Sequence, residues 1–194
     1  MIKWFEYIDV WEKVKRAART TISREGSGKY PTDSWKKTIL LCEHSPIRKI
    51  KIAWKWEIPS WVSVHFVRHK IGIEHWVTTQ RTDRTGVDRS VLPQGAMVKH
   101  ECEANAQAAI FMSRRRLCMQ ASPETRAAWQ EVVDDIRAID PVLASVCVPE
   151  CIYRGFCPEF KSCGYVNTKE YAYRLAEYRN KNITGNAQDA SKER

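Results

Sequence analysis

The segment VSVHFVRHKIGIEHWVTTQRTDR, from Val62 to Arg84, concentrates basic, histidine and hydroxyl side chains within a short distance along the chain. The residues just before it, 49–58, alternate between isoleucine or tryptophan at even positions and mainly lysine or glutamate at odd ones. A period of two is typical of a β-strand with one buried face. The sequence therefore predicts a half-buried strand that leads into the basic segment.

A helix and a second strand are predicted within the basic segment itself. Ser60 can cap a short helix after the strand, and Gly72 can end that helix. Residues 75–82 are rich in β-branched side chains and predict another strand. The basic residues would then lie where a helix is followed by a strand.

Other helices are predicted from apolar spacing, capping residues and the absence of Gly and Pro. They cover residues 3–20, residues from the capping Ser34 to about Cys42, residues 99–119, a helix capped by Ser122 and ended by Asp140-Pro141, and residues 168–180. From Asn182 the chain is polar and charged, which predicts a disordered tail.

Composition limits the class of protein. The chain has 194 residues, 43% of them hydrophobic, which favours one domain with a substantial core. No stretch is long and apolar enough for a membrane span, and the charged N-terminus is unlike a signal peptide, so we expect a cytoplasmic protein without a membrane partner. The net charge of +9 favours anionic partners such as nucleotides, phosphorylated cofactors or nucleic acid, although it could serve solubility alone.

Several short motifs resemble one enzyme family. Arg68-His69-Lys70, followed after seven residues by Thr78, resembles the RHR-x7-S motif of the flavin-dependent thymidylate synthases, with Lys70 in place of Arg and Thr78 in place of Ser. Arg89 and the following VLP are similar to the family's AR-x-VLP element, and Asn105 and Arg116 have the spacing of its NAR-x8-R segment.

The resemblance implies an α+β fold in which helices pack against a mainly antiparallel sheet, like that of the thymidylate-synthase-complementing proteins. The family's central helical insertion is missing here, because the chain passes from Thr82 almost directly to Arg89. By the same resemblance, residues 1–165 form the catalytic domain, residues 166–194 form a C-terminal helix and tail, and the protein is a homotetramer whose sites combine several subunits.

The resemblance also implies an activity, which is methyl transfer to C5 of dUMP with methylenetetrahydrofolate, FAD and NADPH. Substitutions at Arg48, Lys49, His75, Gln80 and Gln107 leave two alternatives open. The first is methylation or hydroxymethylation of a cytosine or other pyrimidine nucleotide. The second is a non-catalytic basic protein that binds nucleotides or nucleic acid.

Site residues follow from the matched positions. The resemblance assigns Arg68, His69, Lys70 and Asn105 to the flavin cofactor. It assigns the nucleotide substrate to His65, Thr78, Arg81, Arg89 and Arg116, with Arg81 contributing only if its strand bulges. Arg116 would be the catalytic residue, since its charge would withdraw electron density from the pyrimidine ring.

Four cysteines lie close together near the C-terminus. Cys147, Cys151, Cys157 and Cys163 could converge on a zinc ion or an iron–sulfur cluster, although their spacing is unusual for structural zinc. The alternative is four buried, reduced thiols, since disulfides are rare in cytosolic proteins.

Overall fold

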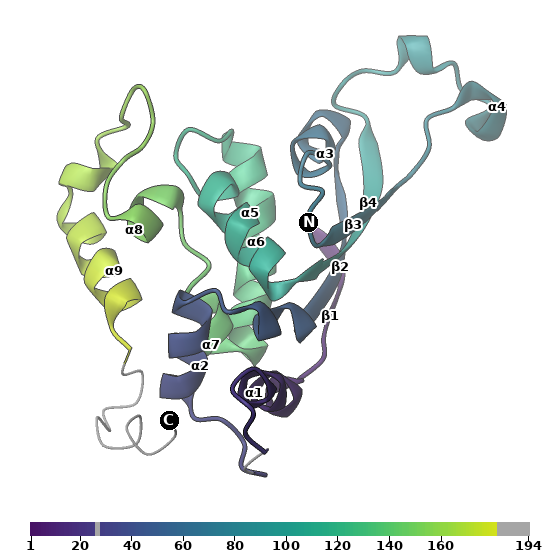
Figure 1. Cartoon of the computed structure of the whole chain (residues 1–194). Coiled ribbons are helices and arrows are strands. Elements are labelled where there is room, and N and C mark those ends of the chain that lie inside the picture. The colour runs from purple at the N-terminus through teal and green to yellow at the C-terminus, as the bar shows by residue number, and fades with distance from the viewer. Residues whose placement is uncertain (26–27, 182–194) are drawn as a thin grey trace.

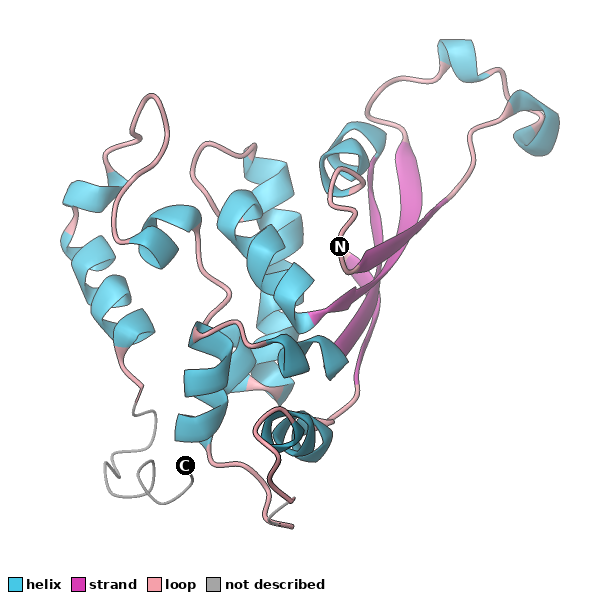
Figure 2. Cartoon of the chain, viewed as in Figure 1, coloured by secondary structure: helices cyan, strands magenta, loops and turns pink. Residues whose placement is uncertain are grey.

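The computed structural model describes residues 1–25 and 28–181 and has an α+β fold. A four-stranded antiparallel sheet has the order β1-β2-β4-β3, and helices cover one of its faces (Figure 1 and Figure 2). The strands are β1 (Ile2–Tyr7), β2 (Lys51–Pro59), β3 (Ile73–Val77) and β4 (Met97–Asn105). The predicted α+β class with an antiparallel sheet is confirmed.

The alternating strand β2 lies at the centre of the sheet. Its even-numbered side chains from Ile52 to Ile58 are buried, whereas its lysines reach acids on β4, as in the pairs Lys51–Glu103 and Lys55–Glu101. Burial of the apolar face therefore stabilises the fold through the hydrophobic effect, and the ion pairs lie on the face toward solvent.

Aromatic rings fill the space between the sheet and the helices. Trp54 packs edge-on against Trp56 and Trp129, with ring centroids 5.3 Å and 5.5 Å apart, and Phe66 lies 4.4 Å from Trp56. These four side chains come from β2, α3 and α6, so they join the sheet to its helical layer.

The helical prediction for residues 99–119 is wrong in its first third. Residues 97–105 form β4, which pairs with β2 on one side and β3 on the other, and only Ala106–Arg116 form helix α5. Val98, His100, Cys102 and Ala104 are buried on alternate positions of β4. Residues 97–105 form a strand because they pair with β2 along one edge and with β3 along the other, and strand formation depends on neighbouring strands more than on intrinsic propensity.

The helical prediction for residues 3–20 is also wrong at its start. Residues 2–7 form β1, an edge strand on β2, and helix α1 covers only Trp11–Thr20. The predicted helix after Ser60 is shorter than expected, since α3 (Ser60–Phe66) begins at Ser60 itself without a side-chain cap and ends well before Gly72.

The remaining helices agree broadly with the predictions. Helix α6 is capped by Ser122 and ends at Asp140, and α9 is capped by Thr168, whereas Thr32 rather than Ser34 caps α2. The bounds are α2 (Asp33–Leu41), α4 (Thr82–Thr85), α6 (Pro123–Ile139), α7 (Pro141–Ala144), α8 (Glu150–Arg154) and α9 (Lys169–Arg179), with 3-10 turns η1 (Ser45–Lys49), η2 (Arg89–Val91) and η3 (Tyr165–Asn167).

An extended arm, residues 78–96, connects β3 to β4 and reaches away from the rest of the molecule (Figure 1). It contains α4 and η2, and every residue from 81 to 91 is exposed. The strand predicted for residues 75–82 is therefore displaced to Ile73–Val77, and its second half belongs to the arm.

Helix α9 packs on the body through Tyr171 and Tyr178, which are both buried. The predicted division at residue 165 stays a prediction, and the tail predicted from Asn182 lies outside the described residues. Within the described part of the chain, no helix has the length and apolar character to cross a membrane.

Candidate functional site

A cavity of about 610 Å³ opens where the segment after α3 meets the start of α5. The segment contributes residues 68–72, and Glu43 and Arg48 lie near η1 on another side. The lining from α5 and its cap consists of Asn105, Gln107, Ala108 and Phe111. This cavity thus brings together all four residues that the sequence assigned to a cofactor, which are Arg68, His69, Lys70 and Asn105.

Asn105 and Gly72 fix the geometry of this cavity. The Asn105 Oδ1 accepts a hydrogen bond from the Ala108 N–H at 2.9 Å and caps α5, while the Asn105 N–H donates to the Gly72 carbonyl at 2.9 Å. Gly72 has φ +74°, and a Cβ there would lie 2.4 Å from the Asn105 Nδ2. Only glycine allows the two segments to approach this closely.

The cavity is basic. Arg68 and Lys70 are exposed, and no carboxylate among residues 1–25 and 28–181 forms an ion pair with either. Glu43 also lines the cavity, but its charge is balanced by Arg114. The cavity therefore offers two unpaired cations to an anionic ligand.

His69 is held neutral by its contact with Arg116. The Arg116 Nε donates to the His69 Nε2 at 2.9 Å, so Nε2 must be unprotonated and the ring proton must lie on Nδ1. Burial and the Arg116 charge lower the pKa of His69 to about 4. His69 thus presents an N–H donor on its other edge at neutral pH.

His65, Arg68 and Arg116 form a second basic group beside the cavity. Burial, followed by the charges of Arg116 and Arg68, lowers the pKa of His65. Burial and the Arg68 charge lower the pKa of the Arg116 guanidinium. A bound anion would offset the positive charge gathered here. Arg116 does not line the 610 Å³ cavity itself, but lies behind His69.

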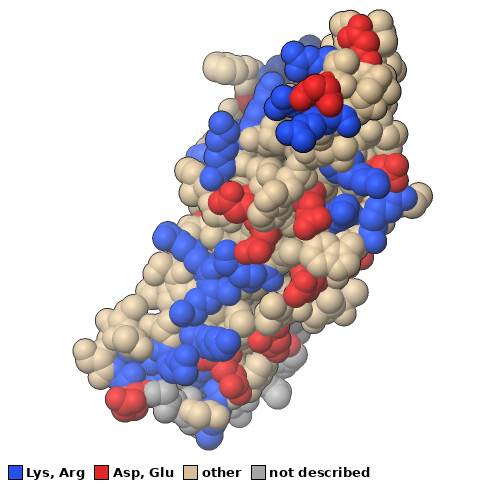
Figure 3. All heavy atoms as spheres, turned by 90° about the vertical axis from the view of Figure 1, so that its right-hand side faces the viewer, with Lys and Arg blue, Asp and Glu red and all other residues tan. Residues whose placement is uncertain are grey.

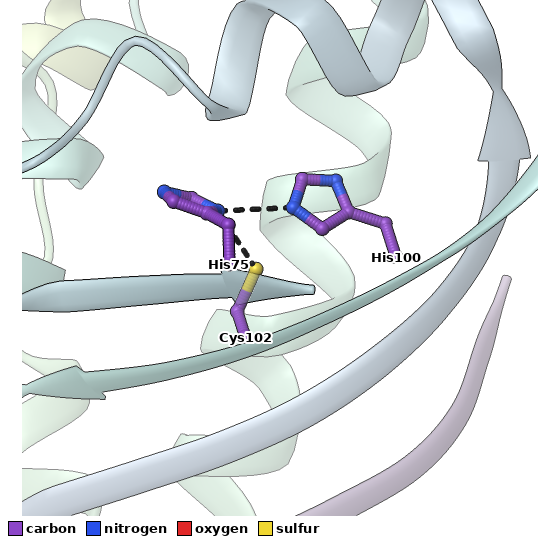
Figure 4. A group of neighbouring side chains, drawn as sticks. All are labelled: His75, His100 and Cys102. Carbon is purple, nitrogen blue, oxygen red and sulfur yellow. Dashed lines mark hydrogen bonds between the residues drawn. The ribbon is translucent and has the colours of Figure 1, made fainter. Parts of the chain in front are cut away.

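A chain of hydrogen bonds supports the His69 backbone, and Figure 4 shows its link between His75 and His100. The His75 Nε2 lies 2.7 Å from the His69 carbonyl oxygen and must donate to it. If the His75 Nδ1 carries no proton, it accepts from the His100 Nε2 at 2.9 Å. The Ser63 hydroxyl then donates to the His100 Nδ1 at 3.0 Å. This sequence of donors fixes both tautomers.

The same chain brings together potential metal ligands. Donor atoms of His75, His100 and Cys102 all lie within 4.8 Å of one another, and the Cys102 Sγ is 3.3 Å from the His75 Nδ1. Their nitrogens are already satisfied by hydrogen bonds, and burial raises the pKa of the Cys102 thiol. We therefore interpret the cluster as a positioning network for residue 69.

Three residues assigned to the substrate lie outside the cavity. Thr78, at the root of the arm, exchanges hydrogen bonds with the Lys99 backbone, with its Oγ1 3.2 Å from the carbonyl oxygen. The Arg81 guanidinium is bound by Asp83 through two hydrogen bonds of 2.9 Å and 2.8 Å. Arg89 is exposed in η2 on the arm. Within one chain these residues do not join Arg68 and Asn105.

Viewed from the side of the arm, Lys and Arg side chains lie in separate groups with Asp and Glu side chains between them (Figure 3). The positive charge on this face is thus divided among several sites. Such a surface suits small anions better than a continuous track along a nucleic acid backbone.

The predicted cysteine group is divided by the structure. Cys151, Cys157 and Cys163 line a second cavity together with Cys118, whereas Cys147 is fully buried elsewhere beside Ser113. Cys118 was not predicted as a ligand because it is remote in the chain. His100 was not predicted either, because the alternate positions Val98, His100, Cys102 and Ala104 are too weakly hydrophobic to indicate a strand clearly.

Comparison with known proteins identifies the fold. No family model matches the sequence, and no curated protein matches it. A crystal structure of the UMP/dUMP methylase PolB from Streptomyces cacaoi, bound with 5-Br dUMP, is similar with a TM-score of 0.59 and 12% sequence identity. The similarity covers 79% of this chain and 95% of that chain. At this identity it establishes a common fold.

Proposed function

We propose that this protein transfers a one-carbon group to C5 of a uracil nucleotide, with FAD bound in the 610 Å³ cavity. The observation that carries the proposal is the convergence of Arg68, His69, Lys70 and Asn105 on that cavity, in a fold shared with a UMP/dUMP methylase. Methylenetetrahydrofolate would supply the carbon and NADPH the reducing equivalents, as the motif resemblance implies.

The cavity residues fit a planar, anionic cofactor. Phe111 is 50% exposed at the cavity and offers a ring face. The cations of Arg68 and Lys70 are suited to phosphate oxygens. The Asn105 Nδ2 and the His69 Nδ1–H supply donors for a polar ring edge. When bound, a flavin would supply hydride chemistry that amino-acid side chains lack.

The protein's own residues would position the nucleotide and stabilise charge. Arg116 uses its Nε on His69, which orients the guanidinium and leaves its terminal N–H groups for a pyrimidine oxygen. A cation placed there would draw electron density from the ring and stabilise the charge that develops during attack by C5. His65 beside it would contact the same nucleotide.

A second copy of the chain would complete the site. The arm carries Arg89 away from its own cavity, and its apolar side chains Val87 and Val91 are 47% and 74% exposed. Exposed apolar groups on an extended segment favour docking onto another surface. We propose that the arm of one subunit brings Arg89 to the nucleotide phosphate in another, within a homotetramer.

Spectroscopy of the purified full-length protein tests the proposal. We expect a flavin absorption spectrum, and we expect dUMP to perturb it under anaerobic reduction more strongly than dCMP does. Arg68→Met should weaken flavin retention, whereas Arg16→Met, the same change at an exposed position on α1, should not. Colourless protein that fails to bind added FAD would refute the cofactor assignment, and preference for dCMP would refute the choice of uracil.

A further inference from the structure

Four cysteine side chains line a second cavity, of about 190 Å³. It lies in the part of the molecule where α8 is beside α5, and Figure 1 shows the course of these two helices. Cys118 follows α5, Cys151 lies in α8, and Cys157 and Cys163 lie in the loop between α8 and η3. All four are free thiols. Three separate segments thus direct sulfur ligands to one place.

The other charged groups around this cavity already have partners. Glu170 accepts from the Tyr165 hydroxyl at 3.3 Å, and that hydroxyl accepts from the Arg174 Nη1 at 3.2 Å. Glu150 accepts from the Arg154 Nε at 2.5 Å and lies 3.9 Å from the Arg115 Nε, while Glu159 lies 3.8 Å from the Arg115 Nη1. The sulfurs are therefore the ligands that remain available. Soft thiolate ligands select zinc, copper(I) or iron–sulfur clusters over hard cations.

The loop that carries Cys157 and Cys163 has little hydrophobic support. Between the end of α8 at Arg154 and the start of η3 at Tyr165 it has no regular secondary structure. Its two phenylalanines, Phe156 and Phe160, are exposed rather than packed. A metal centre would fix this loop to the end of α5, which apolar packing does not do.

The space between the sulfurs distinguishes between metal centres. A single zinc ion with Zn–S bonds of about 2.3 Å brings its sulfurs to about 3.8 Å from one another and leaves no open space between them. The four thiols instead line a cavity of about 190 Å³. Such a space suits a cluster in which thiolates bind different irons.

We propose that Cys118, Cys151, Cys157 and Cys163 bind an iron–sulfur cluster that joins the C-terminal segment to the end of α5. The thiols bind as thiolates, so assembly releases their protons. Cys147 is not part of this centre, because it is buried beside Ser113 and does not line the cavity.

Elemental analysis of anaerobically purified full-length protein tests this proposal. We expect iron and acid-labile sulfide in equal amounts, with visible absorption that decreases on reduction with dithionite. Iron content is independent of flavin and of turnover, so its absence would leave the proposed function untouched. Protein without iron would overturn the inference, and one zinc ion per chain would overturn the assignment to a cluster.

Cysteine variants locate the ligands. Cys118→Ser and Cys157→Ser should each lose most of the iron, whereas Cys42→Ser, at an exposed thiol after α2, should retain it. Cys147→Ser separates the two possible sets, since it should also retain iron. Loss of iron from Cys147→Ser with retention in Cys118→Ser would overturn the proposed ligand set. Circular dichroism melts would show whether each variant is folded.

Discussion

The buried His100 should make the stability of this protein depend on pH between 7 and 5. Its side chain has no exposed surface and is held between Ser63 and His75 by hydrogen bonds. Burial, with a contribution from His75, lowers the pKa of His100 to about 4. In the unfolded chain a histidine has a pKa of about 6.5, so the unfolded state binds more protons between these values.

The sign and size of the effect follow from that difference. The folded state is fully stable above about pH 6.5 and loses stability as the pH falls toward 4. At pH 5 the unfolded histidine is almost fully protonated and the folded one mostly neutral, which costs about 2 kcal/mol relative to pH 7. His69, whose pKa is also lowered to about 4, adds a similar amount. The total of about 4 kcal/mol is large beside a typical stability of about 5–15 kcal/mol.

Replacement of His100 by Gln isolates its share. A Gln amide can still donate to the His75 Nδ1 but does not titrate in this range. His100→Gln should lower stability at every pH and remove about half of the pH dependence, or about 2 kcal/mol. Urea unfolding at pH 7, 6 and 5 measures both quantities, and His44→Gln, at an exposed position, serves as the control.

A parallel fall in the unfolding free energies of wild type and His100→Gln from pH 7 to 5 would refute the reasoning. A loss of stability in His100→Gln at pH 7 would not by itself support the reasoning, because any substitution of a buried residue can produce such a loss. Only the difference between the two pH profiles reports the titration of this residue.

Three further predictions concern the cavity and the arm. Arg116→Met should raise the pKa of His69 from about 4, since Arg116 is the charge that lowers this pKa most. The same variant should abolish nucleotide binding. An NMR titration of His69 and binding calorimetry measure the two effects, and an unchanged pKa or an unchanged affinity would contradict the prediction. Gly72→Ala should cost about 3 kcal/mol in urea unfolding, through a left-handed backbone and a broken helix cap. Its control is Gly86, which has φ +71° and no atom within 4 Å of an added Cβ. Gly86→Ala should cost only about 1 kcal/mol, for the left-handed backbone alone. Equal costs would show that the close approach at Gly72 is unimportant. Val91→Glu should leave the monomer fold intact but dissociate the assembly in analytical ultracentrifugation, and an unchanged sedimentation profile would remove the arm from the interface.

Much of the fold could be predicted from side-chain periodicity. The alternation around Trp54 and Trp56 identified the central strand, and the capping Ser122 identified the start of α6, because both signals are local and strong. The register of β4 could not be read in the same way. His100, Cys102 and Ala104 are weakly hydrophobic, and the segment around them has no Gly or Pro, so the local preference favoured a helix.

The candidate site was predictable only in part. Arg68, His69 and Lys70 adjoin in sequence, and the match of Asn105 to a motif placed it with them. The network behind His69 depends on His100 and Ser63, which meet only after β4 pairs with β3. Cys118 was hidden for a related reason, since a search for ligands within one short window cannot find a partner contributed by another element.

Strand β4 passes into helix α5 without an intervening loop, because Asn105 is the last residue of the strand and Ala106 the first of the helix. The other end of β4, Met97, is the root of the arm. A displacement of the arm along this strand would therefore move the residues that line the cavity. If binding at the arm changed ligand affinity in the cavity, the ligand would change the arm's affinity by the same factor. In an assembly of several copies this reciprocity would lead to cooperative binding curves.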